Sequence, residues 1–392
     1  EIYNAPSSNA AEAKDVYAAV KDHIDYKGHD VSPENFLAVL QGKPAVNCTD
    51  GCTARTLKST AEDNLFVYFV DHGGPGMWAF PPLTQGAFFQ LMYGEDLLAA
   101  LNAASAAKMW KKFAFYVEAC EGSSVFEGQG GSGPIANLST HMGLYAMTST
   151  NATAPSYGTY CGPAALVKGK DLGTCLADEF SAMWMADTEA ASRGTETLQE
   201  QYAKVAAETA KSTSVDPGSI VTRDGDQSFT SDPIGDFLGS SSIPKHAVAS
   251  LNALGSEQER VSSRDVRLRM LEWRLSEAEH GRGAFELGEA RRAVRCERAN
   301  RAHADSIFSR IWGHFHDGAA LHLESVVHRP QTSQVCLRKA IGAVESTLGG
   351  FNGYSLKYAR VLSVLCEDNV PTTKIVDAVM RYATPQPFAE SP

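Results

Sequence analysis

The chain has 392 residues, of which 43% are apolar and 21% charged, an ordinary globular composition that excludes a disordered, collagen-like or coiled-coil protein. No apolar run approaches the roughly 20 residues that a membrane helix needs, so we expect no membrane span. Residues 1–244 carry 15 Lys and Arg against 29 Asp and Glu, whereas residues 245–392 carry 20 against 17. This division favours self-association and disfavours nucleic acid as a partner.

Three apolar runs are predicted to be buried parallel strands: Leu65–Val70, Phe113–Val117 and Leu144–Met147. The Ala- and Leu-rich segment Asp96–Lys112 is predicted to be a helix that crosses between the first two strands. The predicted fold class is therefore α/β, with an open, mostly parallel sheet flanked by helices. In such sheets, chemistry gathers outside the carboxyl ends of the strands.

The segment 212–262 loses periodicity and fills with Ser, Gly, Asp and Pro, which predicts a linker. Ser262 or Ser263 can then cap a helix that ends near Gly281. Further helices are predicted at Ala284–Ala304, Ser306–His316, Val335–Thr347 and Tyr354–Cys366. We therefore expect an α/β domain over residues 1–211 and an all-helical domain over residues 263–392.

Cysteine spacing and glycosylation motifs bear on the cellular compartment. The chain has eight cysteines, and no four of them have the close paired spacing of a zinc site, so we expect no metal and no cofactor. Sequons at Asn47, Asn137 and Asn151 fit a secretory route.

A base and a sulfur nucleophile follow two consecutive predicted strands. The first strand leads into His72, followed by Gly73 and Gly74, and the second leads into Cys120. If the two strands are neighbours, these side chains meet at one sheet edge, as nucleophilic catalysis requires. A nearby imidazole and backbone N–H groups would favour the thiolate and hold an oxyanion. Alone, a buried Cys is more often a small apolar core residue, so the pairing carries the prediction.

The combination of motifs resembles the legumain family, the asparaginyl endopeptidases or vacuolar processing enzymes among caspase-like cysteine peptidases. The resemblance rests on Asp71-His72-Gly73-Gly74-Pro75-Gly76 after one strand and Glu118-Ala119-Cys120-Glu121-Gly122-Ser123 after the next. It continues in order through Tyr145–Thr148, Ser156–Cys161, Thr174–Asp178, Trp184–Asp187 and Glu196–Tyr202, and upstream through Tyr26–Leu37.

The resemblance implies a role for each matching residue. Cys120 would be the nucleophile and His72 the general base, and the Gly73 amide would lie in the oxyanion hole. Asp71 is similar to a family Asp that can form a succinimide. The residues of the pocket that receives an Asn side chain would be Glu118, Ser156, Tyr157 and Asp178. The implied substrates are proteins or peptides with Asn at the cleavage site, or Asp at acid pH.

The resemblance also implies how the chain is regulated and cross-linked. The helical domain is similar to the prodomain that covers the active site of a zymogen. The opposite charges of the two domains, and the seven of eleven His that lie after residue 244, predict acid-triggered release and cleavage after Asn252 or one of Asp224, Asp226, Asp232 and Asp236. Cys161 and Cys175 match one family disulfide, and Cys336 and Cys366 match another. Cys48 and Cys52 either pair locally or stay as thiols, and Cys296 is left without a partner. The implied compartment is the vacuole, the lysosome or the cell exterior.

One departure from the family pattern keeps alternatives open, and two positions bear on whether the reaction ends in hydrolysis or ligation. The family's domain normally begins some strands earlier, so we expect an N-terminally truncated chain. Ligating members of the family tend to carry a bulkier residue at the position of Gly158 and an altered dipeptide at the position of Gly74-Pro75. This chain has Gly and Gly-Pro there, so hydrolysis is the expected outcome. The alternatives are a transpeptidase-type relative, such as a peptide ligase or the GPI transamidase, or a catalytically silent fragment that acts as a binding or inhibitory module.

Overall fold

A computed structural model of the chain describes most of the sequence. The described residues are 3, 15–18, 20–83, 88–126, 143–190, 194–210, 219–239, 260–281, 286–329, 331 and 334–383.

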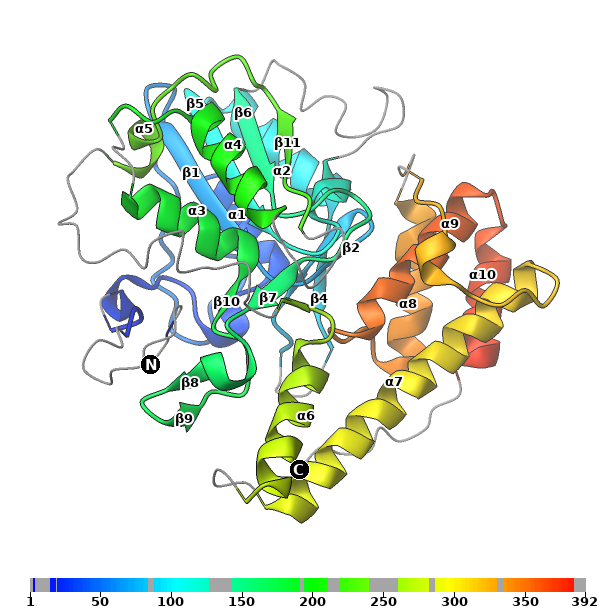
Figure 1. Cartoon of the computed structure of the whole chain (residues 1–392). Helices are drawn as coiled ribbons and strands as arrows, with labels where there is room; N and C mark the ends of the chain where they lie inside the picture. The colour runs from blue at the N-terminus through cyan, green and yellow to red at the C-terminus, as the bar shows by residue number, and fades with distance from the viewer. Residues whose placement is uncertain are drawn as a thin grey trace.

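A four-stranded sheet in the order β1-β5-β6-β11 forms the centre of the molecule (Figure 1). Strands β1 (Asn64–Val70), β5 (Lys112–Glu118) and β6 (Leu144–Thr148) are parallel, which confirms the predicted sheet. The fourth strand, β11 (Thr222–Gly225), is antiparallel to β6. It lies in the segment predicted to be a linker, and that part of the prediction is wrong. Its four residues are polar or Gly and only partly buried, so no apolar run marked them.

Helices cover both faces of this sheet. α1 (Pro33–Leu40) and α2 (Gly94–Ala106) lie on one face, and α3 (Glu179–Ala190) and α4 (Leu198–Thr209) on the other. Alternation along β5 supplies both cores, because Phe113, Phe115 and Val117 pack with α2 while Tyr116 packs with α3. Thus α2 is the predicted crossover helix, although it ends earlier than the predicted Lys112.

Two smaller sheets lie at the carboxyl edge of the central sheet. One contains β2 (Gly73–Gly74), β3 (Met77–Phe80) and β4 (Gln90–Tyr93). In the other, the order is β10 (Ala177–Asp178), β7 (Tyr157–Thr159) and β12 (Val261–Ser262). β12 belongs to the C-terminal part of the chain, so that part adds a strand to the α/β domain.

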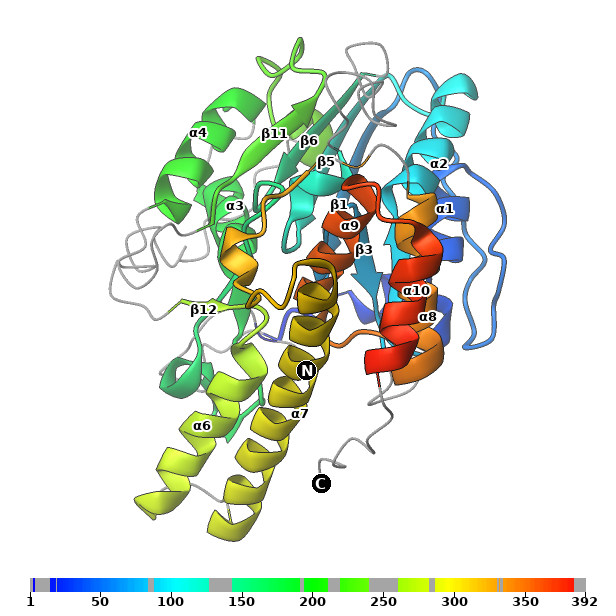
Figure 2. The same cartoon turned by 90° about the vertical axis from the view of Figure 1, so that its right-hand side faces the viewer.

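The C-terminal part is helical, as Figures 1 and 2 show. Its helices are α6 (Val266–Glu279), α7 (Leu287–Phe315), α8 (Val335–Leu348), α9 (Ala359–Glu367) and α10 (Thr372–Tyr382). The prediction of two helices over Ala284–Ala304 and Ser306–His316 is wrong, because no Gly or Pro interrupts the chain at Asp305 and one long helix runs through it.

The remaining elements are short. They are the 3-10 helices Lys21–His23, Gly28–Asp30, Gly122–Val125, Gly162–Ala165, Leu323–Ser325 and Ser355–Tyr358, the α-helical turn α5 (Gly235–Leu238) and the pair β8 (Leu166–Val167) and β9 (Lys170–Asp171).

The helical part shares its core with the small sheet of β2, β3 and β4. Met77 and Ala79 of β3 are fully buried among side chains of α7, α8 and α9. Polar contacts border this core: Gln334 Nε2 donates to the Gly76 carbonyl at 2.6 Å, and Arg338 lies 2.8 Å from Asp96. The helical part is therefore seated on the α/β domain through a continuous apolar interface.

Three disulfides link cysteines that are near in the sequence: Cys48–Cys52, Cys161–Cys175 and Cys336–Cys366. The open choice for Cys48 and Cys52 is therefore settled as a local pair. Cys120 and Cys296 are thiols. Within the described residues, no helix has the length and apolar character needed to cross a membrane.

Candidate active site

The parallel pairing of β1 and β5 brings the two candidate catalytic segments together. Val70 pairs with Glu118, and the Asp71 amide donates to the Glu118 carbonyl at 3.2 Å. Two residues beyond each strand end come His72 and Cys120. The backbone at Gly73 approaches so closely that an added Cβ would lie 2.1 Å from the Cys120 carbonyl oxygen. Only glycine fits this approach, which holds the His72–Gly73 segment against Cys120.

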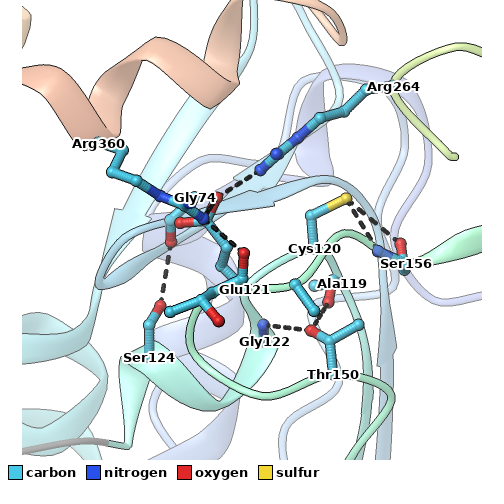
Figure 3. A network of polar contacts seen from close by, with 12 residues as sticks. Gly74, Ala119, Cys120, Glu121, Gly122, Ser124, Thr150, Ser156, Arg264 and Arg360 are labelled. Atoms are coloured by element: carbon cyan, nitrogen blue, oxygen red, sulfur yellow. Dashed lines mark hydrogen bonds and ion pairs between the residues drawn. The ribbon is translucent and has the colours of Figure 1, made fainter. Parts of the chain in front are cut away.

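The Cys120 thiol is 1% exposed and lies beside β7. Its sulfur accepts from the Ser156 amide at 3.3 Å and lies 3.4 Å from Ser156 Oγ, contacts that Figure 3 draws as dashed lines. Ser156 is buried, and Tyr157 follows it at the start of β7. These contacts position the sulfur without withdrawing it into the apolar core.

Three acidic side chains lie at the same strand ends. Glu118 Oε2 accepts from the Ser181 amide at 2.9 Å and from Ser181 Oγ at 2.7 Å. Burial and the neighbouring charge of Asp178 raise the pKa of Glu118, and burial raises the pKa of Asp178 to about 6. Burial also raises the pKa of Asp71 to about 7. A protonated carboxyl group donates a hydrogen bond and an ionised one accepts, so two buried acids with raised pKa values can offer both.

The segment before α6 lies across this site. The Ser263 amide donates to the Ser156 carbonyl at 2.9 Å, and Ser263 Oγ lies 2.8 Å from Ser156 Oγ. A hydrogen bond from Ser263 also lowers the pKa of Asp178 against the effect of burial. The Ser263 side chain therefore hydrogen-bonds to both Ser156 and Asp178, and Ser156 in turn contacts the Cys120 sulfur.

A buried ion-pair cluster holds the C-terminal part over the site. Glu121, directly after Cys120, is fully buried. Arg264 lies 2.6 Å from its Oε1, and Arg360, from α9, lies 2.8 Å from the same oxygen. Figure 3 shows the two guanidinium groups converging on Glu121 from opposite sides. One carboxylate thus joins the catalytic loop to two separate segments of the helical part.

The helical part also covers the imidazole. An added Cβ at Gly353 would lie 3.1 Å from His72 Cε1 and 3.2 Å from Nε2, and the Phe89 ring centroid lies 5.0 Å from that of His72. Burial, with a contribution from the Arg264 charge, lowers the pKa of His72 to about 4. His72 is therefore neutral in this covered form.

The other site residues predicted from the sequence fall in different places. Asn47 is exposed, whereas Asn151 is partly buried and its Oδ1 accepts from the Thr153 and Ala154 amides at 2.9 Å. Asn137 lies outside the described residues, as does Asn252. Of the predicted processing sites, Asp224 lies within β11 and Asp226 is buried.

Sequence reasoning missed Glu121, Ser263, Arg264, Gly353 and Arg360. An acid next to the nucleophile was a visible signal for Glu121, but the partners lie far away in the sequence. A possible metal cluster, Asp30 with Cys48 and Cys52, also comes together among the described residues. Both of its sulfurs are bonded in a disulfide, so it offers no thiolate to a metal.

Comparison with known proteins agrees with this geometry. The model of the Peptidase C13 family matches residues 1–240. Vacuolar-processing enzyme beta-isozyme 1 of Oryza sativa subsp. indica is 31% identical over 377 residues, covering 94% of this chain and 71% of that protein. Vacuolar-processing enzyme of Ricinus communis is 30% identical, covering 94% and 71%. Legumain of Canavalia ensiformis is 27% identical, covering 94% and 75%. The chain therefore belongs to the Peptidase C13 family of cysteine endopeptidases, among the legumains and vacuolar-processing enzymes.

Proposed function

We propose that this cysteine endopeptidase cleaves after Asn, and after Asp at acid pH, and that its helical part keeps it inactive as a zymogen. The observation that carries the proposal is the position of the Ser263 side chain, which contacts Ser156 and Asp178. The short strand β12 runs antiparallel to β7, and its continuation presents the Ser263 side chain to Ser156 and Asp178 beside Cys120. A substrate that adds to the same strand edge would present its own side chain there.

The proposed reaction has two steps. Neutral His72 accepts the Cys120 proton, and the sulfur attacks the carbonyl carbon of the substrate Asn. The N–H groups near Gly73 hold the oxyanion while the C–N bond breaks, and His72 returns the proton to the leaving amine. Water then attacks the thioester as His72 takes a proton from the water, the C–S bond breaks, and His72 passes that proton to the departing sulfur, which frees the acid product and restores the thiol.

The acid pair accounts for the proposed preference for amide side chains. An Asn side chain offers two N–H donors and one acceptor. Glu118 and Asp178 together hold a proton and a carboxylate, so one can donate to the amide oxygen while the other accepts from its NH2. A protonated Asp at acid pH offers the same pattern with one donor fewer. A side chain that leaves these buried groups unpaired is rejected by a large factor.

Covering of the site supports the zymogen role. Gly353 lies against His72, Arg264 and Arg360 bind Glu121, and β12 fills the strand edge of β7. No substrate can reach Cys120 along β7 while β12 is in place. The opposite charge excess of the two parts of the chain favours the same association.

The relatives named vacuolar-processing enzymes support a vacuolar or secretory location, and the three disulfides fit that oxidising route. Glycosylation at Asn47, Asn137 and Asn151 is part of the same proposal.

The direct test is hydrolysis of an Ala-Ala-Asn fluorogenic peptide by the full chain after acidification. We expect hydrolysis of the Asn peptide, at least about tenfold slower hydrolysis of the matched Gln peptide, and loss of activity by a factor of about a thousand or more in Cys120→Ser and in His72→Ala. Cys296→Ser is the control and should retain full activity. Equal rates for Asn and Gln, or full activity of Cys120→Ser, would contradict the proposal. Transfer of the acyl group to an added peptide amine in preference to water would favour a transpeptidase.

A further inference from the structure

A buried carboxylate that is adjacent in the sequence to the proposed acid pair is not used by the proposed chemistry. Glu179 is the first residue of α3, directly after Asp178, and is 1% exposed. Burial raises its pKa to about 7. An isolated carboxylate is costly to bury, so such a group normally has a cation as a partner.

The partner of Glu179 comes from the segment before α6, residues 260–265, called the covering segment below. Arg260 Nη1 lies 2.7 Å from Glu179 Oε1 and donates to the Thr209 carbonyl at 3.2 Å. The Arg260 side chain is 6% exposed. The guanidinium is thus enclosed by a carboxylate at the start of α3 and a carbonyl oxygen at the end of α4, both of which belong to the peptidase domain.

The register of β12 on β7 indicates which substrate residue would take the place of Arg260. Val261 pairs with Gly158, Ser262 pairs with Tyr157, and the Ser263 amide donates to the Ser156 carbonyl. Ser263 is the residue seated beside Cys120, so Arg260 lies three residues before it. A substrate that replaces β12 along β7 places the third residue before its cleaved Asn at Glu179.

We propose that Glu179 and the Thr209 carbonyl form a subsite for a basic side chain, Arg above Lys, three residues before the cleaved residue of a substrate. The proposal rests on the proposed function for the direction and position of the substrate. Departure of the covering segment leaves Glu179 without its cation, and a substrate Arg restores the same pair. Arg is favoured over Lys because its planar group presents several N–H donors and reaches the carboxylate and the carbonyl together.

The test compares two peptides that differ only in charge at this position. The peptides are Arg-Val-Ala-Asn and citrulline-Val-Ala-Asn, each followed by a fluorogenic amide, and the enzyme is the acid-activated full chain. Citrulline keeps the shape of Arg without its charge. We expect kcat/KM to favour the Arg peptide by at least about tenfold, which is typical of a buried charged hydrogen bond.

Two variants test whether Glu179 causes the preference for Arg over citrulline. Glu179→Gln should bring the ratio of the two kcat/KM values close to one and leave the preference for Asn over Gln at the cleaved residue unchanged. Glu189→Gln, an exposed acid on the same helix, is the matched control and should keep the full ratio.

A ratio near one in the parent chain, or the same ratio in Glu179→Gln as in the parent, would overturn the subsite while Asn cleavage stands. If Glu179→Gln fails to fold, the ratio measured on the parent still decides. If the parent hydrolyses no Asn peptide at all, the proposed function fails, and the subsite fails with it.

Discussion

Gly353 is the point at which the helical part comes close to the imidazole of His72, the proposed general base. An added Cβ would lie 3.1 Å from the His72 ring, so Gly353→Val should push the two apart and weaken the cover by about 1–3 kcal/mol. We expect activity to appear at a higher pH than in the parent. The control is Gly342→Val, because an added Cβ at Gly342 meets nothing within 4 Å. Identical pH profiles of activity for Gly353→Val and the parent would contradict this role.

Ser263 fills the proposed specificity pocket without offering an amide. Ser263→Asn should therefore convert the covering segment into a substrate, and the chain should cut itself between residues 263 and 264. Ser262→Asn is the matched control, since consecutive side chains of a strand point in opposite directions. Intact-mass analysis should find the cut only in Ser263→Asn. An uncut chain at every pH, or equal cutting of both variants, would show that this side chain is not read by the pocket.

Among single residues, the sequence predicted those that lie within the peptidase motifs but not those that cover them. Cys120 and His72 follow strand ends that an apolar pattern can locate, whereas the pocket acids Glu118 and Asp178 were predicted from the resemblance alone. Arg264 and Arg360 reach Glu121 from 143 and 239 residues away in the sequence, and neither stands in a local pattern that marks such a pair. Asn specificity came from resemblance and remains a prediction.

Among the structural elements, the catalytic loop after β5 is joined to α9 and to the segment before α6 by one carboxylate. Glu121→Gln leaves Arg264 and Arg360 buried without a counter-charge. Breaking a buried ion pair in this way destabilises the folded, covered form by about 3–5 kcal/mol. We expect the cover to open at neutral pH, measured as faster hydrogen exchange over residues 352–359.

The matched control crosses the same interface at an exposed position. Asp96 lies 2.8 Å from Arg338, with side chains 44% and 32% exposed. Asp96→Asn should change the exchange rate by no more than a factor of about five, because exposed pairs contribute little. Equal effects of the two variants would show that Glu121 has no special part in closure.

Elements were predicted where their pattern was strong and missed where it was not. The strands β1, β5 and β6 have continuous apolar runs, and the helix α8 has a clear apolar period. β11 and β12 are short and largely polar, and they form only because a neighbouring strand offers an edge. The pair β3 and β4 escaped notice because both strands lie under the helical part and lack a polar alternation.

In the whole molecule, lowering the pH protonates His72, Asp178 and Glu179, and these groups affect the opening of the helical part in different directions. His72 has a pKa of about 4 when covered, against an ordinary value of 6.5, so it takes up a proton only when the cover leaves. Falling pH between about 6.5 and 4 therefore favours the open form, by up to roughly 300-fold, the factor that corresponds to this difference in pKa. Burial raises the pKa values of Asp178 and Glu179, which opposes opening on acidification, whereas their contacts with Ser263 and Arg260 lower these pKa values and are lost on opening.

We therefore expect opening below pH 6.5, with a shallower pH dependence in His72→Gln. Hydrogen exchange over residues 352–359, followed from pH 7 to 4, measures it without relying on catalysis. His280→Gln alters an exposed His of the helical part and should leave the profile unchanged. The same slope in His72→Gln as in the parent would assign acid opening to other groups.

The most direct test of a Cys120 site closed by the chain's own helical part is covalent labelling by an Ala-Ala-Asn peptide with a thiol-reactive end group. Peptide mapping reports the labelled sulfur, and Cys296 serves as the internal reference. We predict labelling of Cys120 alone, slow at pH 7 and at least about tenfold faster after acidification. Equal labelling at both pH values, or modification of Cys296 instead of Cys120, would contradict it.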